Sequence, residues 1–227
     1  MIFMLLCVYS DSRVFGGVMT QRSLTGLLLI VGPVVGLLFW LIGPAGILGG
    51  NGLDGNSTNA DIVGVLVANS DWSGYSLLFG TIGLLLWLGG FSGVKSAMSE
   101  GEGSAYSGLG YLFILVAMAG LAASSGIQAG ITLEAAQAGV AGAFYGASDA
   151  LGQYSITILS IGVGLMGIGM LIQKNVSQIL AGIPVVLSIV IVAMVLTDQD
   201  PSVVGAGYGL VTLWSIWLGV TLARSNK

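Results

Sequence analysis

The chain has 227 residues, of which 55% are hydrophobic and only 7% are charged, whereas soluble domains carry about 25% charged residues. This composition is typical of an integral membrane protein. The net charge of −4 and the six Lys and Arg residues argue against a nucleic-acid partner, which needs a basic surface. The chain has no histidine, so it lacks the commonest ligand of zinc, copper and haem sites, and we expect no metal and no cofactor.

Residues 1–18 form an apolar opening that is too short to cross a membrane and has no basic region before it, as a signal peptide would need. We interpret them as an over-extended gene start, because "MTQRSLTG" from Met19 is a compact beginning for the first span. A peripheral tail is the alternative. Residues 1–23 together are expected to form a cytoplasmic tail.

Six apolar stretches follow, each close to the length of about 20 residues that crosses a hydrocarbon core of about 30 Å. They lack the alternation of barrel strands, and only helices or closed barrels satisfy the backbone in lipid. We therefore predict an all-α polytopic membrane protein, in which a bundle of six transmembrane helices occupies residues 24–223 and residues 224–227 form a cytoplasmic tail. The expected spans are 24–42, 74–94, 108–131, 150–173, 179–197 and 205–223.

Two longer connections lie on the predicted external side. In the first, residues 43–72, Thr58 and Asp61 have the spacing of a capping box, and apolar residues follow at helical spacing. This pattern predicts a short amphipathic helix that lies on the membrane surface or caps the bundle. The second connection, from residue 132 onward, is rich in small residues and is expected to extend the third span, with Asp149 capping the fourth.

The basic residues predict the orientation, because cytoplasmic loops collect Lys and Arg. All six fall on one side of the predicted topology, so both termini are expected in the cytoplasm of a prokaryotic cell. Aromatic residues at span ends favour the same arrangement, with Trp40 and Tyr208 at the outer interface and Trp87 and Trp217 at the inner one. The basic residues are Arg13, Arg22, Lys95, Lys174, Arg224 and Lys227.

The stretch "IGVGLMGIGM", residues 161–170, contains the spacing GxGxxG of dinucleotide-binding loops. That fingerprint requires a preceding strand and a later acidic residue, and neither is present. Glycines within an apolar span instead allow another helix to approach closely. We expect a tight pair of the third and fourth spans, with helix packing through Gly120, Ser124, Gly162, Gly164, Gly167 and Gly169.

Polar residues gather at the external junction of the third and fourth spans. One interpretation is a polar cavity that binds a solute. The other, which we favour, is structural: Asp149 caps a helix and the remaining side chains are solvated or bond across the helix pair. The candidate cavity residues are Ser124, Gln128, Glu134, Asp149, Gln153 and Tyr154.

The layout also resembles a known group of proteins. The long first external loop with a short helix ending "LVANSDWSGY" (66–75), and the exit "GGFSGVKSAM" (89–98) from the second span, are similar to those of a family of uncharacterised six-span prokaryotic integral membrane proteins. The resemblance implies the fold and leaves the function open. The glycine and serine content of this chain departs from the members richer in leucine and arginine.

These observations favour a non-catalytic accessory or scaffold subunit, which acts through its helix faces and external loops. Its expected partners are membrane lipids and either another membrane protein or further copies of itself in a homo-oligomer. The alternative is a channel or transporter for a small neutral or weakly polar solute. The spans carry no charged residue at mid-depth, which argues against coupling to ions. A third hypothesis, an intramembrane enzyme, depends on Glu134, Asp149 and Tyr154.

Overall fold

The computed structural model describes residues 20–49, 51–53, 57–133, 138–197 and 201–224. Within these ranges the chain is helical and has no strand, and six of its helices are long and apolar enough to cross a membrane. The predicted bundle of six spans with one short additional helix is therefore confirmed. The helices are α2 (Gln21–Ile42), α3 (Asn59–Ala68), α4 (Ser70–Ala97), α5 (Ser104–Leu133), α6 (Ala138–Gln173), α7 (Gln178–Thr197) and α8 (Pro201–Arg224).

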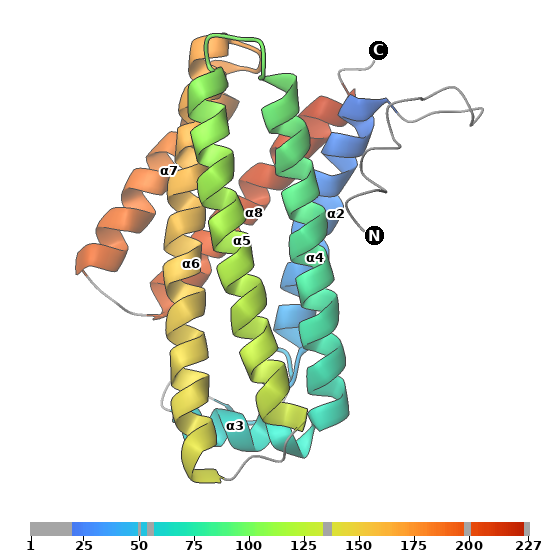
Figure 1. The fold of residues 1–227 in the computed structure, drawn as a ribbon, viewed down its shortest axis with the longest axis vertical. Helices are drawn as coiled ribbons and strands as arrows, with labels where there is room; N and C mark the ends of the chain where they lie inside the picture. Colours follow the sequence, from blue (N-terminus) through green and yellow to red (C-terminus); the bar gives the residue numbers. More distant parts are fainter. Residues whose placement is uncertain (1–19, 50, 54–56, 134–137, 198–200, 225–227) are drawn as a thin grey trace.

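The six long helices form a ring in which neighbours in the sequence are neighbours in space. Each helix contacts the next one along the chain, and α8 returns to contact α2 (Figure 1). The short helix α3 crosses one end of the bundle, at the bottom of Figure 1, where it contacts α4, α5 and α6. We call this the α3 end.

The opposite end of the bundle carries the basic residues of the described chain. Arg22 lies in the first turn of α2, Lys95 lies in the last turn of α4, Lys174 follows α6 and Arg224 ends α8. These helix ends lie together at the top of Figure 1. We call this the basic end. Arg13 and Lys227 lie outside the described residues.

The small helix α3 begins with the predicted capping box. The hydroxyl of Thr58 accepts a hydrogen bond from the Asp61 amide (3.3 Å), and the Asp61 carboxylate accepts one from the Thr58 amide (2.8 Å). It also accepts one from the Thr58 hydroxyl (2.7 Å), and these bonds hold the pKa of Asp61 below its usual value. Val63 of α3 packs against Ile131 of α5 and Ala141 of α6, so α3 caps the bundle.

The start of α6 corrects the prediction for Asp149. The structure ends α5 at Leu133 and begins α6 at Ala138, so most of the connection belongs to the fourth span and does not extend the third. Asp149 consequently lies inside α6 and does not cap it. The physical reason is that residues 138–148 are mostly alanine, glycine and aromatic residues without a proline, and nothing among them interrupts the helix.

Glycines allow α6 to pack closely on two sides. A Cβ atom at Gly162 would lie 2.7 Å from the Gly110 carbonyl oxygen, and one at Gly169 would lie 2.8 Å from the Gly103 carbonyl oxygen, both on the α5 side. The other two glycines of this group, Gly164 and Gly167, face α7 through Ser188 and Pro184. Farther along α5, a Cβ atom at Gly120 would collide with the Ser155 hydroxyl of α6.

Two prolines inside helices each free a backbone carbonyl, because proline has no N–H to donate to the carbonyl four residues earlier. Pro33 of α2 frees the Leu29 carbonyl, which accepts a hydrogen bond from the Ser215 hydroxyl (3.0 Å). Pro184 of α7 frees the Leu180 carbonyl, which accepts one from the Trp214 indole (2.9 Å). Adjacent residues of α8 therefore satisfy both carbonyls in a region where lipid offers no partner.

Trp87 corrects the prediction of an inner aromatic belt. Its side chain is 0% exposed, and its ring packs against Phe91 and Tyr208 with centroid distances of 5.5 and 5.6 Å. The indole N–H donates to the Ser215 hydroxyl (2.7 Å), so the bundle interior supplies the partner that an interfacial tryptophan would find in water. Trp87 is thus part of the core between α2, α4 and α8.

Candidate functional site

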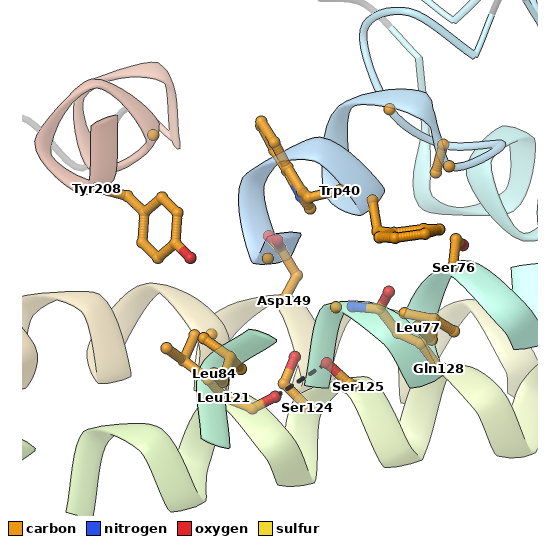
Figure 2. Close-up of a pocket in the computed structure, with 18 of the residues that line it drawn as sticks. Trp40, Ser76, Leu77, Leu84, Leu121, Ser124, Ser125, Gln128, Asp149 and Tyr208 are labelled. Atoms are coloured by element: carbon orange, nitrogen blue, oxygen red, sulfur yellow. Dashed lines mark hydrogen bonds between the residues drawn. The ribbon is translucent and has the colours of Figure 1, made fainter. Parts of the chain in front are cut away.

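A cavity of about 320 Å³ opens inside the ring toward the α3 end, at the lower limit of the size of about 300–1,000 Å³ that is usual for ligand pockets (Figure 2). Its walls come from five of the six long helices, namely α2, α4, α5, α6 and α8, and from residues 43–46 and α3. The cavity therefore lies between the helices of the ring near the α3 end and is not confined to the junction of α5 and α6.

The α5 and α6 wall is polar and is built around two serines. The hydroxyl of Ser124 donates to the Ser148 carbonyl, and the hydroxyl of Ser148 donates to the Ser124 carbonyl, each at 2.9 Å. Both serines are buried. These reciprocal bonds join the two helices and leave the Ser148 oxygen free to accept a further bond, which the Gln128 amide donates at 3.1 Å.

The same wall carries the only acidic side chain among the described lining residues. Asp149 is half-buried, and its carboxylate accepts a hydrogen bond of 2.8 Å from the Gln153 amide, one turn later on α6. No Lys or Arg lies among the described residues that line the cavity. Among the described residues, the carboxylate therefore has one hydrogen-bonded side-chain partner, the uncharged Gln153 amide.

The facing wall is aromatic and apolar. Phe39 and Trp40 come from α2, Leu84 from α4 and Tyr208 from α8. The Tyr208 ring meets the Trp87 ring edge to face, with an interplanar angle of 87°, and Figure 2 shows its hydroxyl directed into the cavity. The packing of the core around Trp87 thus sets the position of one cavity residue.

Glycines in the cavity walls leave the space open, because they have no side chain to fill it. Gly36, Gly80, Gly152 and Gly205 line the cavity on four different helices. A Cβ atom added at Gly80 or Gly205 would meet nothing within 4 Å. Larger residues at these positions would fill the cavity without a direct collision of their first side-chain atom.

The structure places four of the six predicted cavity residues along the polar wall: Ser124, Gln128, Asp149 and Gln153. Tyr154 does not line the cavity, since its side chain is 65% exposed on the outer face of α6. Glu134 lies outside the described residues.

Ser148 and the entire aromatic wall were not predicted from the sequence. Ser148 is adjacent to Asp149, but the predicted connection placed it outside the span. The residues of α2, α4 and α8 lie far away in the sequence, and no local spacing joins them to Gln128 or Asp149. Only the return of α8 to α2 brings them together.

The described residues contain no group of three or more Asp, Glu, Cys or His side chains that would hold a metal ion.

No protein-family model matches the sequence, and no curated protein and no solved structure was found to match it. The cavity and its chemistry are therefore the features that indicate a function.

Proposed function

We propose that the protein binds a small solute in this cavity and acts as a channel or transporter. The supporting observation is the mixed lining, in which a few polar groups, most of them on α5 and α6, lie among apolar and aromatic groups from all five helices. Ligand sites commonly combine apolar walls with a small number of placed polar groups.

The distribution of charge supports an orientation for this site. If Lys and Arg mark the cytoplasmic side, the basic end is cytoplasmic, both ends of the chain are cytoplasmic, and the cavity opens to the outside. The length of α6 supports a shallow position, because its 36 residues span about 54 Å at 1.5 Å per residue, more than a hydrocarbon core of about 30 Å. Asp149 lies about 36 Å from Gln173 along the helix, at the level of the outer headgroups.

Cysteine labelling tests the site and its orientation together. Ser125 lines the cavity, and the chain has a single native cysteine, Cys7, which is first replaced by Ser. We expect Ser125→Cys to react with an impermeant thiol reagent on intact cells, whereas Ser99→Cys, at the basic end, reacts only after the cells are opened.

A cavity-filling variant supplies the control. Gly80→Leu is expected to slow labelling at Ser125→Cys at least tenfold, because its side chain extends into the cavity. Gly74→Leu on the same helix also meets open space but does not line the cavity, and it should leave the rate unchanged. Protection of Ser125→Cys from both sides of the membrane would contradict the proposal.

The accessory or scaffold role that the sequence favours is the alternative. The described residues include an apolar groove between α2 and α8, with Thr212 as its single hydroxyl, but lipid chains would fill such a groove as readily as a partner helix. Native mass spectrometry after gentle purification distinguishes the two roles, since a stoichiometric protein partner supports the accessory subunit. The resemblance to the six-span prokaryotic family suits either role.

A further inference from the structure

The proton donors and acceptors of the polar wall can be assigned from their partners. The Ser148 hydroxyl donates its hydrogen bond to the Ser124 carbonyl. Its oxygen can then only accept from Gln128, so the donor of that bond is the Gln128 Nε2 atom. An ionised carboxylate only accepts, so Gln153 must also present Nε2 to Asp149. These two bonds therefore fix which atom of each side-chain amide is the nitrogen and which is the oxygen.

This orientation leaves acceptors for a ligand. Neither amide oxygen, Gln128 Oε1 or Gln153 Oε1, is used in these bonds, and Asp149 keeps most of its acceptor capacity. The Ser125 hydroxyl donates to the Leu121 carbonyl (3.1 Å) and so offers only lone pairs to the cavity. Figure 2 shows Gln128, Ser125 and Asp149 along the same side of the hollow.

The charge of the cavity is unbalanced as well. Asp149 is the single ionisable carboxylate among the described lining residues, and no cationic side chain lies beside it. A carboxylate held partly away from water without a counter-ion is unfavourable, and a bound cation would relieve that cost. The rings of Phe39, Trp40, Tyr145 and Tyr208 add surfaces that attract cations.

We propose that the cavity selects a small primary amine with a short apolar body, an inference that depends on the proposed solute-binding function. An ammonium group has three donors and no acceptor, which matches the carboxylate of Asp149 and the amide oxygens of Gln128 and Gln153. The apolar body lies against Leu84, Leu121 and the aromatic wall. An anion would be repelled by the Asp149 carboxylate. An alcohol would leave the negative charge of Asp149 uncompensated.

Three probes of similar shape and different charge test this selectivity: butylamine, 1-butanol and butyrate. Isothermal titration calorimetry on the full-length protein in an uncharged detergent is expected to show saturable binding of butylamine, at least tenfold tighter than that of 1-butanol or butyrate. Asp149→Asn should remove this preference, with butylamine binding weakened about tenfold or more, as expected for one lost charge-assisted hydrogen bond.

Two further variants keep the test interpretable. Asp149→Glu retains the charge and should retain the preference for butylamine even if Asp149→Asn unfolds. Asp71→Asn removes an exposed carboxylate from the α3 end that does not line the cavity, and it should change nothing.

Equal binding of butylamine and 1-butanol, or an unchanged preference in Asp149→Asn, would overturn the selectivity for amines and leave a solute cavity in place. Saturable binding of none of the three probes would also overturn the inference. The labelling of Ser125→Cys tests the proposed function separately, because it reports whether the cavity is accessible and does not depend on which ligand the cavity binds.

Discussion

Trp87 of α4 and Ser215 of α8 are joined by a hydrogen bond of 2.7 Å from the indole Nε1 to the hydroxyl oxygen, in the centre of the bundle. The same hydroxyl donates a hydrogen bond to the Leu29 carbonyl of α2 (3.0 Å). A single side chain therefore connects three helices, and it compensates for the donor that Pro33 lacks.

Replacing Ser215 by Ala should destabilise the protein by about 1–2 kcal/mol, because it leaves the Trp87 N–H and the Leu29 carbonyl without partners. Thermal unfolding in detergent measures the effect. Thr221→Ala is the matched control, since the Thr221 hydroxyl bonds only within its own helix, to the Trp217 carbonyl. Equal melting temperatures for Ser215→Ala and Thr221→Ala would contradict this account.

Pro33→Ala should partly rescue Ser215→Ala. Alanine restores the backbone N–H that can bond the Leu29 carbonyl, so the second substitution repairs one of the two groups that the first leaves unpaired. A double-mutant cycle on the unfolding free energy is expected to give a coupling of about 0.5–2 kcal/mol. Strict additivity of the two substitutions would show that the Leu29 carbonyl does not need Ser215.

Leucine at Gly162 or Gly167 should lower the melting temperature strongly. A Cβ atom at Gly162 would lie 2.7 Å from the Gly110 carbonyl oxygen, and one at Gly167 would lie 2.8 Å from the Ala181 carbonyl oxygen. Backbone atoms cannot move aside as a flexible side chain can, and overpacking of this kind costs about 1–3 kcal/mol or more. A Cβ atom at Gly126 of α5 would meet nothing within 4 Å, so Gly126→Leu should unfold like the parent protein.

The capping box of α3 should weaken in acid. Hydrogen bonds from the Thr58 hydroxyl and amide lower the pKa of Asp61 in the folded protein. The box therefore stabilises α3 at pH values above the unfolded pKa of Asp61, and this contribution is lost as the pH falls through the lower, folded pKa.

A spin label at Gly64, where a side chain meets open space, reports the mobility of α3 by electron paramagnetic resonance. We expect an immobilised label near pH 6 and a more mobile one near pH 2, and in Asp61→Ala the label should be mobile at both. A label equally immobile at both pH values in the parent protein would show that the tertiary contacts of α3 outweigh its cap.

Much of the fold follows from local patterns, but the cavity does not. The apolar runs predict the six spans because crossing lipid demands length and hydrophobicity, and Thr58 with Asp61 predicts the start of α3 because a cap is a contact between near neighbours. Asp149 was placed wrongly because the small residues before it carry no signal that separates a connection from a helix. Trp87 was assigned to an interface because its partner, Ser215, is far away in the sequence.

The hydrogen bonds from α8 to the carbonyls that Pro33 and Pro184 leave free also have a consequence for biosynthesis. Of the described helices, α8 is the last to be synthesised, so the donor to the Leu29 carbonyl of α2 is made only after the four spans between them. The arrival of Trp214 and Ser215 then closes both exposed backbone groups in one step. A chain that lacked α8 would leave the Leu29 and Leu180 carbonyls without these two donors.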